Sequence, residues 1–266
     1  MKSLRKAAEI LARFTRESPT PAAAEIIRAL RLPRSTGYRF IRAMTELGFL
    51  DRDPSTDRLR PGLSFIQLGH LAQEQFELVQ VARPFMEELA RETQETVLLP
   101  FLRNIRAYCA EKVESTQRIR LSFDRGASLP LHAGASAKIL LAQLPDEEVQ
   151  RIIRRAGLPK YTANTITSPA RLKQELAEIR QRGYATSYEE VDPGAWAISA
   201  PILGSPDGTI AGLTISGPLQ RLTPKVEADW IDAVCRMAAR ISAKLGHISP
   251  AKAANATAML RRRGKQ

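Results

Sequence analysis

The sequence predicts an α+β protein in which a small basic helical module precedes a larger domain of helices and strands. Residues 21–61 contain two short helix patterns separated by Leu-Pro, followed by two short runs around a polar turn. Beyond residue 77, strand-like runs alternate with amphipathic helices. A length of 266 residues, 44% of them hydrophobic, is enough for two domains that each have a core.

The first helix of the module is predicted in PAAAEIIRAL, where Ile26, Ile27 and Leu30 recur at helical spacing. Pro33 disfavours helix at the residue before it and fits the first turn of a helix after it, so one helix ends and another begins there. The second helix is predicted over about residues 33–47, and Gly48 ends it. Its expected buried stripe consists of Phe40, Ile41, Met44 and Leu47.

The other side of this second helix carries side chains suited to reading DNA. They are Arg34, Ser35, Thr36, Tyr38, Arg39 and Arg42. Arginine pairs bidentately with guanine or holds phosphate, and Ser and Thr also bond to bases. Early residues of the second helix are the usual base readers of a helix-turn-helix. The pattern therefore predicts a recognition helix.

A two-stranded wing is predicted after the recognition helix. Residues 49–52 and 58–60 flank residues 53–57, which are all of types that favour turns. Arg58 and Arg60 are expected to face the phosphate backbone. Helix, turn, helix and wing together predict a winged helix-turn-helix with double-stranded operator DNA as its partner. The competing interpretation is an Arg-rich helix that is only a solvated face or a protein-docking surface.

The distribution of charge supports DNA binding without reference to a motif. Residues 1–62 contain 13 Lys/Arg against 7 Asp/Glu, whereas residues 63–250 contain 22 against 21. Residues 251–266 contain 5 Lys/Arg and no acidic residue. Contact with phosphate needs local positive charge, so a basic N-terminal module joined to a nearly neutral domain is the pattern of a DNA-reading protein.

The rest of the chain is predicted as a linker helix and a mixed domain. The predicted domain boundaries are 1–62 for the winged helix-turn-helix, 63–77 for the linker helix, 78–249 for the larger domain and 250–266 for a disordered basic tail. Helices are expected over 78–93, 136–144, 146–155, 169–182 and 225–245. Strands are expected over 96–99, 107–110, 119–122, 184–188, 195–202 and 210–216, with a hairpin turn at 205–208. The stripe Val81, Phe85, Leu89 and Ala90 is expected to face the core.

Several classes of function are not supported by the residues. No stretch is long and apolar enough to cross a membrane and no signal-peptide core is present, so we expect a cytoplasmic protein. No motif indicates a cofactor. His132 precedes Ser136 by four residues, yet no acid at useful spacing completes a catalytic triad. The acidic run 189–192 lacks a His or Cys partner, and Cys109 and Cys235 form no CxxC pair, so we predict neither an enzyme nor a metal site.

Three sequence blocks in order carry a resemblance to a known family. They are LPRSTGYRFIRAMTELGFLDRDPSTDRLRPG, LPLHAGASAKILLA, and GYATSYEEVDPGAWAISAPI with GLTISGP. Over roughly residues 3–247 the chain resembles the IclR family of transcriptional regulators. The resemblance implies a GAF-like effector-binding domain, homodimers or dimers of dimers, and repression or activation of nearby operons governed by a small molecule.

The resemblance also implies which residues form the effector cleft. They are Ala135 and Ser136 at the start of a helix, Ser187, Glu190 and Ala197 in the next block, and Thr214 and Ser216 in the last strand. A helix N-terminus beside hydroxyls is a suitable site for a carboxylate, so a small organic acid is the predicted effector.

The chain departs from the family pattern beside this cleft. Many relatives carry Asp before the acidic pair and Cys on the following strand, where this chain has Ser187, Tyr188 and Ala197. Trp196 adds a large ring nearby, which favours an aromatic or larger acid. Alternatively, Trp196 and Tyr188 face the core or solvent. An alternative function also stays open, namely a small-molecule-binding or enzymatic domain with a basic protein-docking head.

Overall fold

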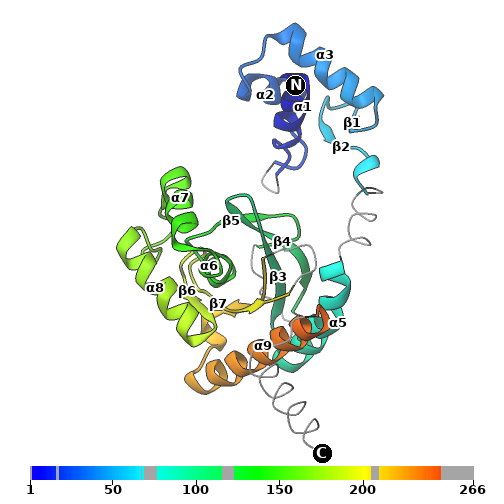
Figure 1. Ribbon diagram of the computed structural model, residues 1–266. Coiled ribbons are helices and arrows are strands. Elements are labelled where there is room, and N and C mark those ends of the chain that lie inside the picture. Colours follow the sequence, from blue (N-terminus) through cyan, green and yellow to red (C-terminus); the bar gives the residue numbers. More distant parts are fainter. Residues whose placement is uncertain are drawn as a thin grey trace, which may run out of the picture. The chain divides into compact units, whose positions relative to one another are not determined.

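The computed structural model divides the chain into two compact units, Met1–Phe76 and Glu77–Gln266. It describes residues 2–15, 18–66, 68, 77–115, 123–204 and 210–246 (Figure 1). Most of the predicted linker helix, the predicted strand 119–122, the hairpin turn 205–208 and the basic tail lie outside the described residues. We call the two parts the N-terminal unit and the C-terminal unit.

The N-terminal unit contains helices and a two-stranded antiparallel sheet, and residues 64–66 begin a further helical segment after the sheet. Its elements are α1 (Lys2–Leu11), α2 (Ala23–Ala29), α3 (Arg34–Glu46), β1 (Leu50–Arg52) and β2 (Leu59–Pro61). Leu50 pairs with Pro61 and Arg52 with Leu59, so β1 and β2 form the predicted wing. Apolar side chains from all five elements form one buried cluster that includes Ile10, Ile26, Ile41 and Leu59. Helix α1 was not predicted from the sequence.

Close packing of α2 against α3 depends on Gly37. A Cβ atom at residue 37 would lie 2.5 Å from Cγ1 of Ile27, closer than any ordinary contact. Gly37, Ile41 and Met44 are the buried residues of α3. The predicted stripe is wrong only at Leu47, which is 67% exposed, because Phe40 is half-buried and packs against the cluster. Leu47 is the C-cap residue, so the chain has left the helix before it could pack on this face.

The C-terminal unit is built on a six-stranded sheet. In spatial order its strands are β5 (Ser128–Pro130), β4 (Arg106–Val113), β3 (Thr96–Arg103), β8 (Ala211–Pro218), β7 (Ala195–Ile202) and β6 (Ala185–Tyr188). Every neighbouring pair is antiparallel. The helices are α5 (Glu77–Thr93), α6 (Ala135–Ala142), α7 (Asp146–Ala156), α8 (Pro169–Arg182) and α9 (Pro224–Lys244), with a 3-10 turn at Leu219–Arg221.

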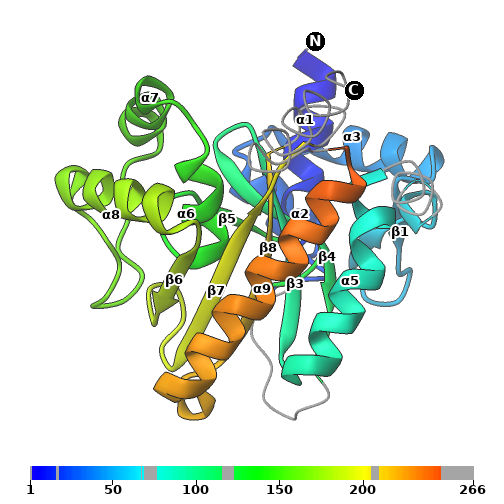
Figure 2. The ribbon, with the colours of Figure 1, turned by 60° about the horizontal axis from the view of Figure 1, so that its bottom comes forward.

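The helices cover the two faces of this sheet differently. Helices α5 and α9 lie on one face, and the sheet curls around α6 on the other (Figures 1 and 2). We call these the α9 face and the α6 face. All eight residues of α6 are buried, including Ser136 and Lys138. Helices α7 and α8 pack outside α6 and close a second apolar cluster around it.

Two details of the C-terminal unit differ from the sequence predictions. Strand β5 was not predicted, because a three-residue strand at a sheet edge has too short a pattern to recognise. The predicted stripe of α5 is only partly right: Leu89 is buried as predicted. Ala82 and Met86 are buried in place of Val81 and Phe85, and Phe85 is half-buried beneath the guanidinium of Arg240. The predicted and the observed buried stripes of α5 both have helical spacing, so periodicity alone could not decide between them.

Candidate DNA-binding surface and effector site

The polar side chains of α3 lie on the side of the helix away from its core contacts. Arg34, Ser35, Arg39 and Arg42 are exposed, whereas Thr36 and Tyr38 are half-buried. Tyr38 also packs against the apolar cluster, so only part of its ring is available to a partner. Arg42 Nε donates to Glu46 Oε1 at 2.8 Å, and this pair raises the pKa of Arg42. The exposed part of α3 is therefore a row of cations and hydroxyls.

The wing is held in place by its own side chains. Asp53 accepts hydrogen bonds from the N–H and hydroxyl of Ser55, at 2.8 and 2.6 Å, and from the Thr56 N–H. These bonds lower the pKa of Asp53 to about 2. Arg58 donates from Nη1 to the carbonyl of Thr20 at 2.7 Å, and Arg60 lies 3.4 Å from Asp51. Both arginines remain exposed, although each already has a partner inside the unit.

On the α6 face of the C-terminal sheet, three buried hydroxyls form a chain. Ser136 Oγ donates to Thr214 Oγ1 at 3.0 Å, and Ser199 Oγ lies 2.8 Å from the same atom. Ser199 also reaches the carbonyl of Leu213 at 3.2 Å. Strand pairing explains the arrangement, because Ser199 lies directly opposite Thr214 in the β7–β8 register. These three hydroxyls satisfy one another without solvent.

Ser216 lies two residues after Thr214 on β8 and therefore on the same face, but its hydroxyl does not join this chain of hydrogen bonds. The residue is 4% exposed, and its Oγ has no hydrogen-bond partner among the described residues. Its neighbours in register are Ala197 of β7 and Thr96 of β3. A buried hydroxyl without a partner costs on the order of 1–3 kcal/mol, so it calls for an explanation such as a missing ligand.

Six of the eight predicted effector residues come together on this face. Ala135 and Ser136 come from α6, Ser187 from β6, Ala197 from β7, and Thr214 and Ser216 from β8. Ser187 pairs with Ala197, which pairs with Ser216, so these three form a row across the sheet. The sequence analysis missed Ser199, although its position two residues after Ala197 puts it on the same face.

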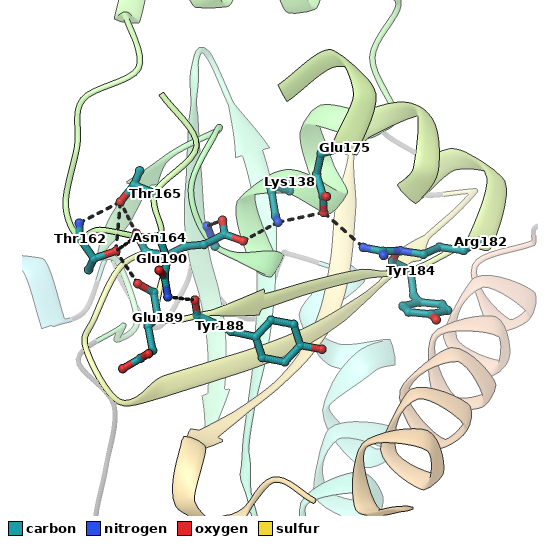
Figure 3. A network of polar contacts seen from close by, with 11 residues as sticks. Lys138, Thr162, Asn164, Thr165, Glu175, Arg182, Tyr184, Tyr188, Glu189 and Glu190 are labelled. Carbon is teal, nitrogen blue, oxygen red and sulfur yellow. Dashed lines mark hydrogen bonds and ion pairs between the residues drawn. The ribbon is translucent and has the colours of Figure 1, made fainter. Parts of the chain in front are cut away.

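Glu190 lies at the start of α6 and is already occupied by groups of the protein. Its Oε2 accepts the Gly134 N–H at 3.0 Å, and its Oε1 accepts from Lys138 Nζ at 2.6 Å. Lys138, 1% exposed, also donates to Glu175 Oε1 at 3.0 Å, and Glu175 in turn meets Arg182 (Figure 3). The sequence analysis did not single out Lys138. Glu190 therefore fixes the start of α6 through bonds to both of its carboxylate oxygens.

The backbone around Glu190 is tied to the loop before α8. Thr162 donates to the carbonyl of Glu189 at 2.5 Å, and Thr165 donates to the carbonyl of Glu190 at 2.7 Å. Asn164 Nδ2 donates to the carbonyl of Tyr188 at 3.2 Å (Figure 3). Side chains thus order a segment that has no regular secondary structure.

Trp196 and Tyr188 lie on the α9 face, contrary to the prediction that Trp196 contributes to the cleft. Trp196 is 1% exposed, stacks on Trp230 of α9 with 4.8 Å between ring centroids, and donates from Nε1 to the Pro218 carbonyl. The Tyr188 hydroxyl donates to Glu227 of α9 (Figure 3 shows its ring). Successive residues of a strand point to opposite faces, so Ser187 and Ala197 face α6 while these two aromatics do not.

The histidine and the two cysteines considered as candidate catalytic or metal-binding residues are partly or fully buried within the protein. His132 Nε2 lies 2.9 Å from the Pro159 carbonyl, and burial lowers the pKa of this imidazole. Burial raises the pKa of the Cys109 thiol to about 12 and also raises that of Cys235. Within the described ranges, no group of three His, Cys, Asp or Glu side chains could hold a metal ion. None of the helices described is long and apolar enough to cross a membrane.

Comparisons with known proteins match both units. The model of the IclR helix-turn-helix domain matches residues 3–54, and that of the bacterial transcriptional regulator IclR C-terminal domain matches residues 70–243. The transcriptional regulator KipR of Bacillus subtilis is 34% identical over 229 residues, covering 86% of this chain and 91% of KipR.

Two solved structures are similar over most of the chain. The Thermotoga maritima IclR structure is 31% identical, with a TM-score of 0.72 and coverage of 93% of this chain and 100% of the other. An IclR homolog from Microbacterium hydrocarbonoxydans, crystallised with 4-hydroxybenzoate, is 26% identical, with a TM-score of 0.79 and coverage of 91% and 98%.

Proposed function

We propose, since the chain belongs to the IclR family of bacterial transcriptional regulators, that it binds operator DNA through α3 and the wing and responds to a small organic acid held on the α6 face. The family is not enzymatic, and its domain models match both units. The alternative of an enzymatic domain with a protein-docking head therefore receives no support. The N-terminal unit is the helix-turn-helix DNA-binding domain and the C-terminal unit is the effector domain.

The proposed DNA contacts divide into readers and positioners. Arg34, Ser35, Thr36, Tyr38, Arg39 and Arg42 of α3 would enter the major groove, and Arg58 and Arg60 of the wing would meet phosphate. A homodimer, or a dimer of such dimers, would place two α3 helices in successive major grooves of double-stranded DNA. Arg34 and Arg39 are the strongest candidate readers, because both are exposed and bond to no described side chain.

Binding of DNA can be tested by comparing arginines of the same type. We expect Arg39→Ala to weaken operator binding by roughly tenfold or more, and Arg42→Ala by less because Glu46 already pairs with it. Arg171→Ala, on the exposed side of α8, is the matched control and should have no effect. Affinity should also fall steeply with salt. Equal losses in all three variants would contradict the proposed reading surface.

The effector proposal rests on Ser216, the buried hydroxyl without a described partner. A carboxylate placed between β8 and the first turn of α6 would accept this hydroxyl. It would also meet the N–H groups of Ala135 and Ser136, which bond to no described acceptor. Ala197, which is small and half-buried, lies beside Ser216 in register and would contact the body of the ligand. Ser187 and Thr214 would flank it on the same face.

The aromatic character of the acid is the finer part of this proposal. Trp196 and Tyr188 no longer support it, because both lie on the α9 face. Its support is the homolog that was crystallised with 4-hydroxybenzoate, an aromatic acid. An effector screen should therefore contain aromatic and aliphatic acids of matched size.

Removal of one hydroxyl tests the effector site in two ways. Ser216→Ala deletes an unsatisfied buried group, so the effector-free protein should be as stable as the wild type or more stable. The same change should weaken binding of the acid about tenfold, measured as a smaller concentration-dependent rise in Tm. Ser168→Ala, at an exposed helix N-cap that makes no side-chain capping bond, should change neither property.

The results separate the two halves of the proposal. A saturable rise in Tm with one class of acid, lost in Ser216→Ala and kept in Ser168→Ala, supports the effector site. If no acid raises Tm, the proposed effector class is wrong, while the proposal for DNA binding stands or falls on the arginine variants.

A further inference from the structure

A second, cationic pocket lies outside the proposed effector site in the C-terminal unit. It has a volume of about 540 Å³ and lies between the β3–β4 turn and one side of α7. Its lining residues are Asn104, Ile105, Arg106, Tyr108, Glu148, Arg151, Ile152 and Arg155. None of them belongs to the effector set on α6, β6, β7 or β8. Residues 148, 151, 152 and 155 follow helical spacing, so α7 presents one face to the pocket.

Three guanidinium groups meet around this pocket. Arg106 donates from Nε to the Ser128 hydroxyl at 2.8 Å and from Nη2 to the Ser128 carbonyl at 3.0 Å. These bonds fix the position of the Arg106 guanidinium from the side of the sheet. Arg151 lies 2.7 Å from Glu148, the one acidic residue of the lining. Arg155 is exposed and pairs with no described carboxylate. The lining therefore carries two more positive than negative charges.

The base and rim of the pocket differ in chemistry. Ile152 is buried and Ile105 half-buried, and both belong to or pack against the apolar cluster around α6. Tyr108 and Asn104 add a phenol and a carboxamide beside the guanidiniums. Asn104 adopts a left-handed conformation, with φ of 56°, in the short turn between β3 and β4. An apolar base below a cationic rim suits an anion attached to a less polar body.

We propose that this pocket binds the phosphate group of a small ligand. A phosphate monoester carries about 1.5 to 2 negative charges at neutral pH and three strong acceptor oxygens. That charge matches the excess of the lining, and the forked donors of Arg bind phosphate oxygens in pairs. A monocarboxylate would neutralise only half of the excess. The phosphate can come from inorganic phosphate or from a phosphate ester whose apolar part rests on Ile105 and Ile152.

The test uses the full-length protein and two defined probes. Inorganic phosphate and phenyl phosphate are titrated by calorimetry at constant ionic strength maintained with NaCl. We expect saturable binding at one site per chain, tighter for phenyl phosphate if the isoleucine base contributes. Arg155→Gln should weaken this binding about tenfold or more, as expected for loss of a charge-assisted hydrogen bond.

Arg154→Gln is the matched control, because it removes the same charge from the adjacent residue of α7. Arg154 lines a different, more apolar pocket between α7 and α8. Its replacement should leave phosphate affinity within about twofold of wild type, because distant charges are screened by salt. Both variants should retain the Tm of the ligand-free protein, since both side chains are exposed.

Three outcomes would overturn the proposal. The first is the absence of saturable binding of either probe to the wild-type protein. The second is an equal loss in Arg154→Gln and Arg155→Gln, which would indicate only nonspecific attraction. In the third, neither probe binds, yet Arg155→Gln weakens binding of double-stranded DNA. That result would mean that these arginines bind the phosphates of the DNA backbone and not a small ligand.

Discussion

The two faces of the C-terminal sheet are built from the same strands, but β7 and β8 present different chemistry on each. On the α9 face, Trp196 stacks on Trp230, and apolar residues such as Ile198 and Leu213 fill the layer below α9. On the α6 face, β7 and β8 present Ser199, Thr214 and Ser216. One face therefore excludes water by apolar packing, whereas the other encloses polar groups that must find partners within the protein or in a ligand.

The comparison shows why position on a face matters more than proximity in sequence. Trp196 and Ala197 are consecutive, yet one supports the apolar core and the other lies beside the unpartnered Ser216. The polar face is tolerated because most of its groups are paired, including the hydroxyl chain and the Lys138 ion pairs. Among the described residues, the Ser216 hydroxyl is the buried side-chain atom left without a partner, and the proposed effector site is based on it.

The largest effect should come from breaking the ion pairs on the α6 face. Lys138→Met would leave the buried Glu190 carboxylate without its cation, whereas the half-buried Glu175 keeps Arg182 as a partner. Removal of one partner of a buried pair costs about 3–5 kcal/mol, so the free energy of unfolding should fall by that order. Urea denaturation followed by Trp fluorescence measures it, because both tryptophans lie in the C-terminal unit.

Two further variants sharpen this measurement. Lys173→Met removes an exposed lysine of α8 and should change the free energy of unfolding by less than about 0.5 kcal/mol. Adding Glu190→Gln to Lys138→Met should recover part of the loss, because the uncompensated charge next to Gly134 disappears. If Lys138→Met lowered the free energy of unfolding no more than Lys173→Met does, the ion pairs of Lys138 would contribute far less to stability than their contacts indicate.

The sequence predicted most elements whose two ends carry strong signals. Helix α8 was predicted over its observed span, with Pro169 at its first position and Gly183, at φ of 82°, ending it. Strand β7 was also predicted within its observed bounds. Helix α1 was missed, and it contributes only Ile10 as a fully described buried apolar residue. Ala7, Ile10 and Leu11 nevertheless recur at helical spacing and pack in the N-terminal cluster, so this helix could have been predicted from the sequence.

The site was less accessible from the sequence than the fold. The resemblance to the family predicted that Ser187, Ala197 and Ser216 lie in one cleft. In the structure, strand pairing places the three residues in a row. Ser199 could have been assigned from strand alternation, because it lies two residues after Ala197, whereas the role of Lys138 depends on which strand faces which helix. Trp196 was misplaced for the same reason: alternation defines two faces but does not say which one meets α6.

A smaller effect should distinguish the two faces through Trp196. Trp196→Phe removes the hydrogen bond to the Pro218 carbonyl and weakens the stack on Trp230, so the free energy of unfolding should fall by about 1–3 kcal/mol. Fluorescence of the remaining Trp230 follows the unfolding. Affinity for the acid should stay unchanged, which is the reverse of the result expected for Ser216→Ala. Loss of acid binding in Trp196→Phe at a temperature where it remains folded would place the aromatic in the cleft after all.

The smallest effect concerns protonation next to α6. Burial lowers the pKa of His132 below its ordinary value of 6.5, outweighing the hydrogen bond to Pro159 and the nearby Glu190 carboxylate. The unfolded chain therefore binds a proton at a higher pH than the folded one, so this residue makes stability fall as the pH drops below 6.5. His132→Gln keeps a donor for the Pro159 carbonyl but does not titrate. Urea denaturation at pH 7.5 and 5.5 should show a smaller loss of stability in the variant than in the wild type. An equal loss in both proteins would mean that His132 accepts its proton as readily folded as unfolded, and that the α6 face is more open to water than its burial indicates.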